Sequence, residues 1–118
     1  PTELAAARDA LRSALTEGEE DWLRSLPLIW RSGNLAVVHA AADPRLPIDA
    51  QDEEVLLWAR GAAFWAPRED GIWIAHGHTP VEEPELHNGR IAVDTGAVFT
   101  DRLTAAHVCD GAVHFIST

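Results

Sequence analysis

The chain has 118 residues and a hydrophobic content of 47%, which suits one globular domain with a modest core and is too little chain for two. Its formal net charge of −10 argues against nucleic acid or an anionic membrane as the main partner. No apolar run approaches the ~18 residues of a membrane span, no signal-peptide pattern is visible, and the single Cys109 fits a reducing compartment. We therefore expect a cytoplasmic protein.

The first part of the sequence predicts two helices. Residues 1–15 place leucines and alanines on one helical stripe, with Thr2 as a candidate N-cap. Residues 16–27 follow, with Thr16 and Glu19 at capping-box spacing and a proline that ends the second helix.

Strands dominate the rest of the chain. Residues 28–40 have the pattern of a hairpin that turns at Ser32-Gly33-Asn34, and its second apolar run suits a strand buried on both faces. Residues 49–60 predict a short helix with acids in its first turn and Arg60 at its end. Residues 72–75 predict another short strand, which ends at His76.

The last third is expected to be an acidic loop, a strand and a hairpin. The loop covers residues 80–89, and residues 90–99 begin as a strand. Residues 102–117 form the clearest element, a hairpin with Asp110-Gly111 as a two-residue turn. Helices followed mostly by strands give a mixed α/β fold class.

Two histidines share a context. His39 and His78 each end or closely follow an apolar strand, and each precedes a loop that contains proline. Ligand sites of open α/β sheets collect at the carboxyl ends of strands, and imidazole there can bind a metal. The alternative is that each is an ordinary half-buried histidine. His76 could be a supporting donor, a proton carrier or a strand-end residue.

Two further charged residues are candidates for the same site. The guanidinium of Arg60 matches two phosphate oxygens, although an arginine at a helix end also satisfies carbonyl groups. Asp94 could be a metal ligand, could orient a histidine, or could form a turn with the glycine that follows.

A rival metal site lies in the last hairpin. With a two-residue turn, His107 faces His114 across the strands, and Cys109 shares their face. These three side chains could hold zinc, although the hairpin offers no fourth ligand. The other interpretation is an ordinary hairpin face, and the acidic clusters of the chain are most simply solvated surface.

Taken in order, five stretches resemble the calcineurin-like metallophosphoesterases. They are "LRSLPLIW", "LAVVHAAADPRLPIDAQ", "LLWAR", "IAHGHTP" and "GRIAVDTGAVFTDRLTAAHV". More narrowly, they are similar to the branch of bacterial serine/threonine protein phosphatases and symmetrical dinucleoside tetraphosphatases. The resemblance runs from about Trp22 to Val108.

The resemblance implies a four-layer α/β/β/α sandwich with mixed sheets. It also implies two divalent metal ions (Mn, Fe or Zn) and a bridging hydroxide that attacks phosphorus. His39 and His78 match the two histidine ligands of one metal, and Arg60 matches the arginine that grips the phosphate. Near the site would lie His76, Asp94 and Thr95. Of these, His76 is expected to be a supporting catalytic residue.

The amino-terminal motifs of that family, DxH, GDxxDRG and GNHE or GNHD, do not occur here. We therefore expect residues 1–118 to be a single partial domain, the carboxyl-terminal half of a catalytic domain. The parent protein would hydrolyse a phosphate ester of a phosphoprotein or nucleotide, and this chain alone would be inactive. Its expected partners are the missing half or a second copy of itself.

An alternative from another class is a non-catalytic binding or scaffold module that retains the phosphatase fold. A third possibility is a dinucleoside polyphosphate hydrolase.

Two geometric predictions test the resemblance. The ring nitrogens of His39 and His78 should lie within roughly 4 Å of one another, because ligands that share a metal each lie ~2.1 Å from it. Arg60 should point into the same cleft rather than pair with Glu53 or Glu54.

Overall fold

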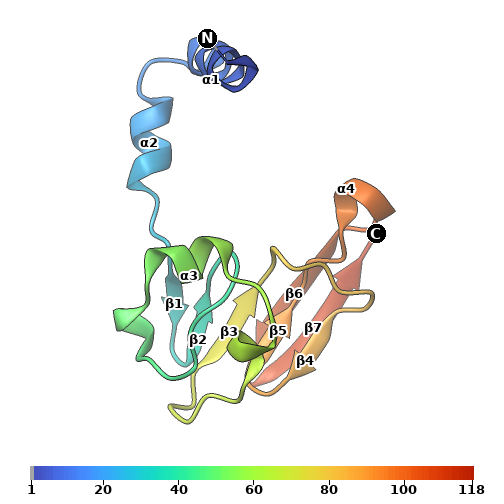
Figure 1. Ribbon diagram of the computed structural model, residues 1–118. Helices are drawn as coiled ribbons and strands as arrows, with labels where there is room; N and C mark the ends of the chain where they lie inside the picture. The colour runs from blue at the N-terminus through green and yellow to red at the C-terminus, as the bar shows by residue number, and fades with distance from the viewer. Residues whose placement is uncertain (1) are drawn as a thin grey trace.

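The computed structural model of the chain describes residues 2–118 and shows a mixed α/β fold (Figure 1). Two helices come first, five strands form one sheet, and the last two strands form a hairpin. The elements are α1 (Glu3–Ala14), α2 (Glu19–Ser25), β1 (Trp30–Ser32), β2 (Leu35–Val37), the 3-10 helix η1 (Ile48–Ala50), α3 (Glu53–Trp58), the 3-10 helix η2 (Ala62–Trp65), β3 (Trp73–His76), β4 (Glu85–His87), β5 (Arg90–Ala92), α4 (Ala97–Thr100), β6 (Thr104–Cys109) and β7 (Ala112–Ser117).

Helices α1 and α2 project away from the sheet (Figure 1). The Thr2 hydroxyl accepts a hydrogen bond from the backbone N–H of Ala5, which confirms the predicted N-cap. The capping box of α2 is only half formed, because Glu19 reaches back to the Thr16 N–H but Gly18 occupies the N-cap position. Neither helix has a buried residue, and the radius of gyration of 16.5 Å exceeds the ~13.5 Å of a compact chain this long.

The five-stranded sheet has the order β1-β2-β3-β5-β4. Its three central strands, β2, β3 and β5, run parallel, and β1 and β4 are antiparallel edges. The first predicted hairpin is confirmed, with Ser32 opposite Leu35. Burial of β2 on both faces was wrong for Val37, which is 38% exposed. Val108 and Val113 of the β6–β7 hairpin lie near Leu35 at the start of β2.

The acidic stretch 80–89 is not a loop throughout. Residues Glu85–His87 form β4, which pairs with β5 through a turn at Asn88 and Gly89. Both turn residues have positive φ, as a two-residue hairpin turn requires. All three residues of β4 are exposed, so the strand lacks the apolar alternation by which strands are recognised.

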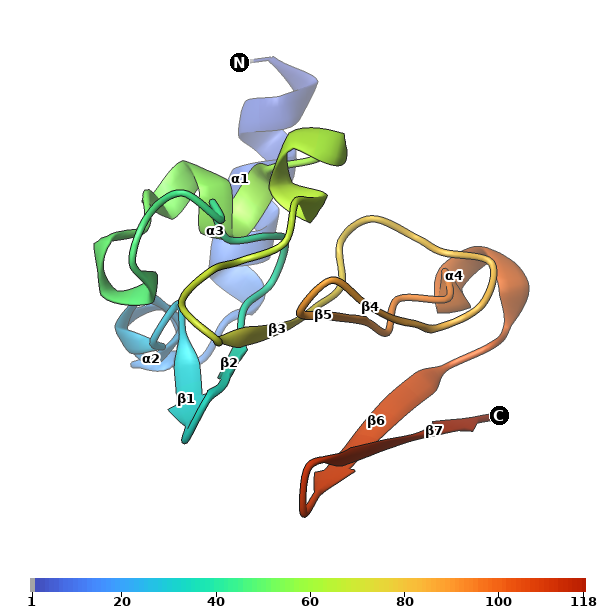
Figure 2. The same cartoon turned by 90° about the horizontal axis from the view of Figure 1, so that it is seen from below.

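The two faces of the sheet have different covers (Figure 2). On one side, Leu56 of α3 and Ile48 of η1 pack on Ala36 and Ile74 to form the core. On the other side lies the β6–β7 hairpin, whose predicted turn at Asp110 and Gly111 is confirmed. The described residues thus form a helical layer and two sheet layers, and none of the helices in residues 2–118 has the length and apolar surface needed to cross a membrane.

Candidate functional site

The parallel strands β2, β3 and β5 end at one edge of the sheet, and a polar side chain follows each end by two residues. His39 follows Val37, His78 follows His76, and Asp94 follows Ala92. The carboxyl edge of parallel strands is where open α/β sheets bind ligands, because strand ends there present their following loops together.

The two predicted metal-binding histidines meet at this edge. The Nε2 of His39 lies 3.1 Å from the Nδ1 of His78, and the ring centroids are 4.9 Å apart. The predicted proximity is therefore confirmed, across 39 positions of sequence. Two nitrogens at this separation can both reach one metal ion at ~2.1 Å.

Arg60 joins the pair from two residues beyond α3, which ends at Trp58 rather than at Arg60 as the sequence predicted. Its Nε donates to the Nε2 of His78 over 3.1 Å, and the described residues show no ion pair between Arg60 and Glu53 or Glu54. The predicted location of the guanidinium is confirmed. Trp58 stands edge-on to the His78 ring at 6.1 Å and is 63% exposed.

These contacts fix the protonation of the two rings. An arginine can only donate, so the Nε2 of His78 accepts, and its proton sits on Nδ1. Nδ1–H then donates to the Nε2 of His39. Partial burial first, then the charge of Arg60 and the His39 ring, lower the pKa of His78, which favours the neutral ring. A metal between the two rings would require the proton of His78 to move to Nε2.

The backbone that presents His78 is a tight turn. His78 has φ of 64°, and the N–H of Thr79 donates to the carbonyl of Gly77 over 2.7 Å. This i→i+2 bond around a residue with positive φ is a γ-turn of the strained kind. The N–H of Gly77 donates to the carbonyl of His39 over 2.9 Å, which ties the turn to the end of β2.

Asp94 lies close to this turn, and its contacts match those of a turn-forming residue. Its Oδ1 accepts from the N–H of Gly96 over 2.9 Å. A Cβ on Gly77 would lie 3.5 Å from the Asp94 Cβ, so the two segments pass at van der Waals distance. Thr95 is buried and bonds to the carbonyl of Arg102 and the hydroxyl of Thr104, away from the histidine pair.

His76 is buried, and both its ring nitrogens have partners within the protein. Nδ1 lies 3.1 Å from the carbonyl of Gly77, and Nε2 lies 3.2 Å from Nη1 of Arg90. Neither nitrogen is free for a substrate proton, so this geometry favours a supporting role over that of a proton carrier. Sequence patterns did not single out Arg90, whose burial depends on β4 and on Trp65 of η2.

The rival site in the last hairpin has the predicted register, with His107 opposite His114 and Cys109 opposite Ala112. The two histidine rings stack at 6.3 Å. Throughout residues 2–118, however, no three His, Cys, Asp or Glu side chains gather closely enough to hold a metal ion. This finding applies equally to the pair formed by His39 and His78, which provides two ligands.

Part of the chain is similar to proteins that share one name. No family model matches it. It is 55% identical over 42 residues to a protein of Bacillus thuringiensis (strain Al Hakam) named asymmetrical bis(5'-nucleosyl)-tetraphosphatase PrpE. A protein of the same name from Geobacillus sp. (strain WCH70) is 52% identical over 42 residues. Each match covers 35% of this chain and 17% of the relative.

The fold has a solved counterpart. A crystal structure described as that of "a putative diadenosine tetraphosphatase" superposes with a TM-score of 0.70 and 22% identity, covering 92% of this chain and 58% of that one. At this identity the likeness shows a common fold. The chain therefore spans little more than half of its structural counterpart and about a sixth of the curated relatives. The relatives are named asymmetrical, so they give no support to the symmetrical branch expected from the sequence.

Proposed function

We propose that this chain is part of a metal-dependent hydrolase of phosphate esters or phosphoanhydrides, with His39, His78 and Arg60 at its active site. The observation that carries the proposal is the convergence of these three side chains, from two parallel strand ends and one helix, within 3.1 Å contacts at a partly exposed edge. Two imidazoles and a guanidinium with free Nη donors suit a phosphate held beside a metal.

The substrate class that we favour is a dinucleoside polyphosphate. The similar proteins are named tetraphosphatases, and the chain's net charge of −10 does not suit a nucleic-acid polymer. A phosphoprotein is the second candidate, since the exposed edge would also admit a phosphorylated side chain. The alternative of a non-catalytic binding module remains as an outcome of the experiment below.

The described residues fit part of one metal site. His39 Nε2 and His78 Nδ1 converge as two ligands, but a catalytic site needs at least three protein ligands, and residues 2–118 provide no such group. We propose that the remaining ligands, those of a second metal included, come from a part of the protein outside this chain. Residues 1–118 would then be the carboxyl-terminal part of a four-layer sandwich.

Each residue has a distinct role in this proposal. His39 and His78 would hold a divalent metal ion, which would supply Lewis-acid activation of a phosphate and of water. His39 Nε2 and His78 Nδ1 lie 3.1 Å apart and would hold the metal ion between them. Arg60 keeps its guanidinium at the same edge, where its Nη groups can bind two phosphate oxygens.

The test is hydrolysis of diadenosine tetraphosphate by the protein that carries this chain, with millimolar Mn²⁺ and with separation of the products. Asymmetrical cleavage gives ATP and AMP, whereas symmetrical cleavage gives two ADP. We expect His39→Ala and His78→Ala each to lower kcat at least a hundredfold. His114→Ala, a histidine of the exposed hairpin, is the matched control and should leave kcat unchanged.

Two results would contradict the proposal. Full activity of the His78→Ala variant would remove the histidine pair from the active site. Binding of diadenosine tetraphosphate without turnover by the unaltered protein would instead support the non-catalytic module.

A further inference from the structure

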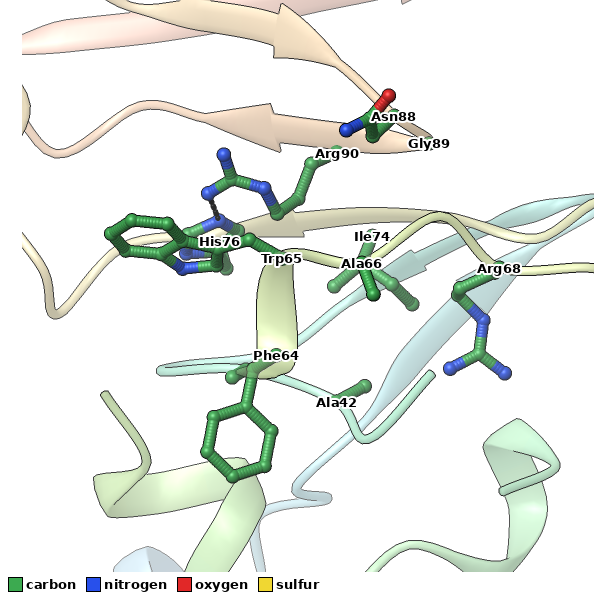
Figure 3. A pocket seen from close by; sticks show the side chains of 11 residues that line it. Ala42, Phe64, Trp65, Ala66, Arg68, Ile74, His76, Asn88, Gly89 and Arg90 are labelled. Atoms are coloured by element: carbon green, nitrogen blue, oxygen red, sulfur yellow. Dashed lines mark hydrogen bonds between the residues drawn. The ribbon is translucent and has the colours of Figure 1, made fainter. Parts of the chain in front are cut away.

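Arg90 is a buried arginine whose charge is only partly compensated by its neighbours. It is the first residue of β5, is 8% exposed, and packs its guanidinium 4.9 Å from the Trp65 ring centroid (Figure 3). Its Nη2 donates to Glu85 over 3.0 Å, but that carboxylate side chain is 46% exposed. Its buried Nε has no partner among the described residues. Desolvation of such an ion often outweighs what one pairing returns.

The cavity around Arg90 is not a ligand site. Its volume is about 10 Å³, which is about the space of one water molecule. The side chains around it, Trp65, His76 and Arg90 among them, close on one another in Figure 3. The guanidinium thus contacts neighbouring side chains rather than a ligand, and besides Glu85 and Trp65 it reaches the ring of His76.

The contact with Arg90 dictates the tautomer of His76. The guanidinium Nη1 lies 3.2 Å from Nε2 and can only donate, so Nε2 must accept. The proton of the neutral ring is then on Nδ1, which donates to the Gly77 carbonyl over 3.1 Å.

The Gly77 carbonyl is the acceptor on which the γ-turn at His78 depends. It receives both the His76 Nδ1–H and the Thr79 N–H, the second over 2.7 Å. A residue such as His78 with φ of 64° persists in that strained conformation only where its surroundings hold it there. The hydrogen bonds from Arg90 to His76 and from His76 onward therefore end at the Gly77 carbonyl oxygen, the acceptor of the γ-turn that orients the His78 side chain.

We propose that Arg90 is a positioning residue, which acts through His76 and the Gly77 carbonyl to fix the γ-turn that presents His78 to His39. The pair of Arg90 with Glu85 orients the guanidinium for this contact. The importance of this arrangement for hydrolysis rests on the proposed function, but the positional effect on His78 does not.

The test compares Arg90→Met with Arg102→Met in the full chain. Arg102 also pairs with a carboxylate, that of Glu83, but does not contact His76, so it is the matched control. Two readouts report on position: the His76 tautomer from imidazole ¹⁵N NMR shifts, and the hydrogen-exchange rate of the Thr79 amide. Arg90→Met should shift His76 away from the Nδ1–H tautomer and speed Thr79 exchange at least tenfold, whereas Arg102→Met should change neither.

A conservative variant separates positioning from packing. In Arg90→Lys, the ammonium can still donate to His76 Nε2, although it lacks the second nitrogen with which the guanidinium also binds Glu85. It should keep the Nδ1–H tautomer and bring Thr79 exchange back toward its original rate. An unchanged tautomer and unchanged exchange in Arg90→Met would overturn the proposal, as would equal effects of Arg90→Met and Arg102→Met.

A separate measurement distinguishes this inference from the proposed function. Substoichiometric Mn²⁺ should broaden the ring signals of His39 and His78, in the protein that carries this chain, more than those of His107 and His114. Equal broadening of all four rings would count against the metal site, while the comparison of Arg90 variants would still decide the positioning role.

Discussion

Asp43 holds the loop that leaves His39, and its removal should destabilise the fold in a manner that depends on pH. The residue is 7% exposed, and its carboxylate accepts hydrogen bonds from the N–H, Nε and Nη2 of Arg45 over 2.9, 2.9 and 2.6 Å. Its backbone N–H also bonds the Gln51 side chain. The side-chain bonds from Arg45, then the backbone bond, lower the pKa of Asp43 to about 2.

The expected magnitude follows from that pKa. A fall from 3.8 to about 2 corresponds to roughly 2.4 kcal/mol between the two protonation states. The Arg45 side chain is 81% exposed, and solvent screening reduces the value to about 1 kcal/mol. Because the folded-state pKa is the lower one, the stabilisation is present above pH 3.8 and is lost as the pH falls toward 2.

Urea denaturation of the unaltered chain and of Asp43→Asn, at pH 7 and at pH 2, measures this effect. The variant should be less stable by about 1 kcal/mol at pH 7, and the two curves should converge at pH 2. Asp49→Asn is the control, because Asp49 is 83% exposed and its contact with Arg31 is 3.5 Å long. Equal stability of Asp43→Asn and the unaltered chain at pH 7, or a difference that persists at pH 2, would refute the reasoning.

Three further predictions concern packing and backbone conformation. Ile91→Ala should cost about 2–5 kcal/mol in urea denaturation, against about 0.5–1.5 for Ile91→Val, because Ile91 is 1% exposed. Gly77→Ala should fold normally, since the added Cβ would lie 3.5 Å or more from its neighbours, whereas Gly96→Ala, at φ of 69°, should lose about 1–2 kcal/mol. Trp22 and Trp30 are 59% and 57% exposed, so sedimentation velocity should show concentration-dependent association that Trp22→Ser with Trp30→Ser reduces.

Local chemistry explains which elements the sequence could predict. The hairpins at Gly33 and at Asp110-Gly111 follow from turn residues that tolerate positive φ, and the helix cap at Thr2 follows from a hydroxyl before a helical stripe. Strand β4 could have been found from the Asn88-Gly89 dipeptide, but its exposed, polar residues hide it from hydrophobic periodicity. The exposure of Val37 could not, because the covering of a short apolar strand depends on packing between elements distant in sequence.

Some features of the candidate site could likewise be predicted from the sequence, and others could not. The meeting of His39 with His78 was predictable, because both follow apolar strands and parallel strand ends share one edge. The contacts of the His76 ring were not predictable, because one of them comes from a buried arginine on the neighbouring strand. Arg90 of β5 lies opposite Ile74 of β3, two residues from His76. Burial of an arginine in a short strand is a tertiary event, which side-chain type alone argues against.

We propose that His39 and His78 bind one metal ion between His39 Nε2 and His78 Nδ1. The most direct test is anomalous diffraction from Mn²⁺-soaked crystals of the protein that carries this chain, with His78→Ala crystals as the control. We expect an anomalous peak within about 2.3 Å of both nitrogens, absent in the variant. No peak at this position, or a peak that persists in His78→Ala at unchanged height, would contradict it.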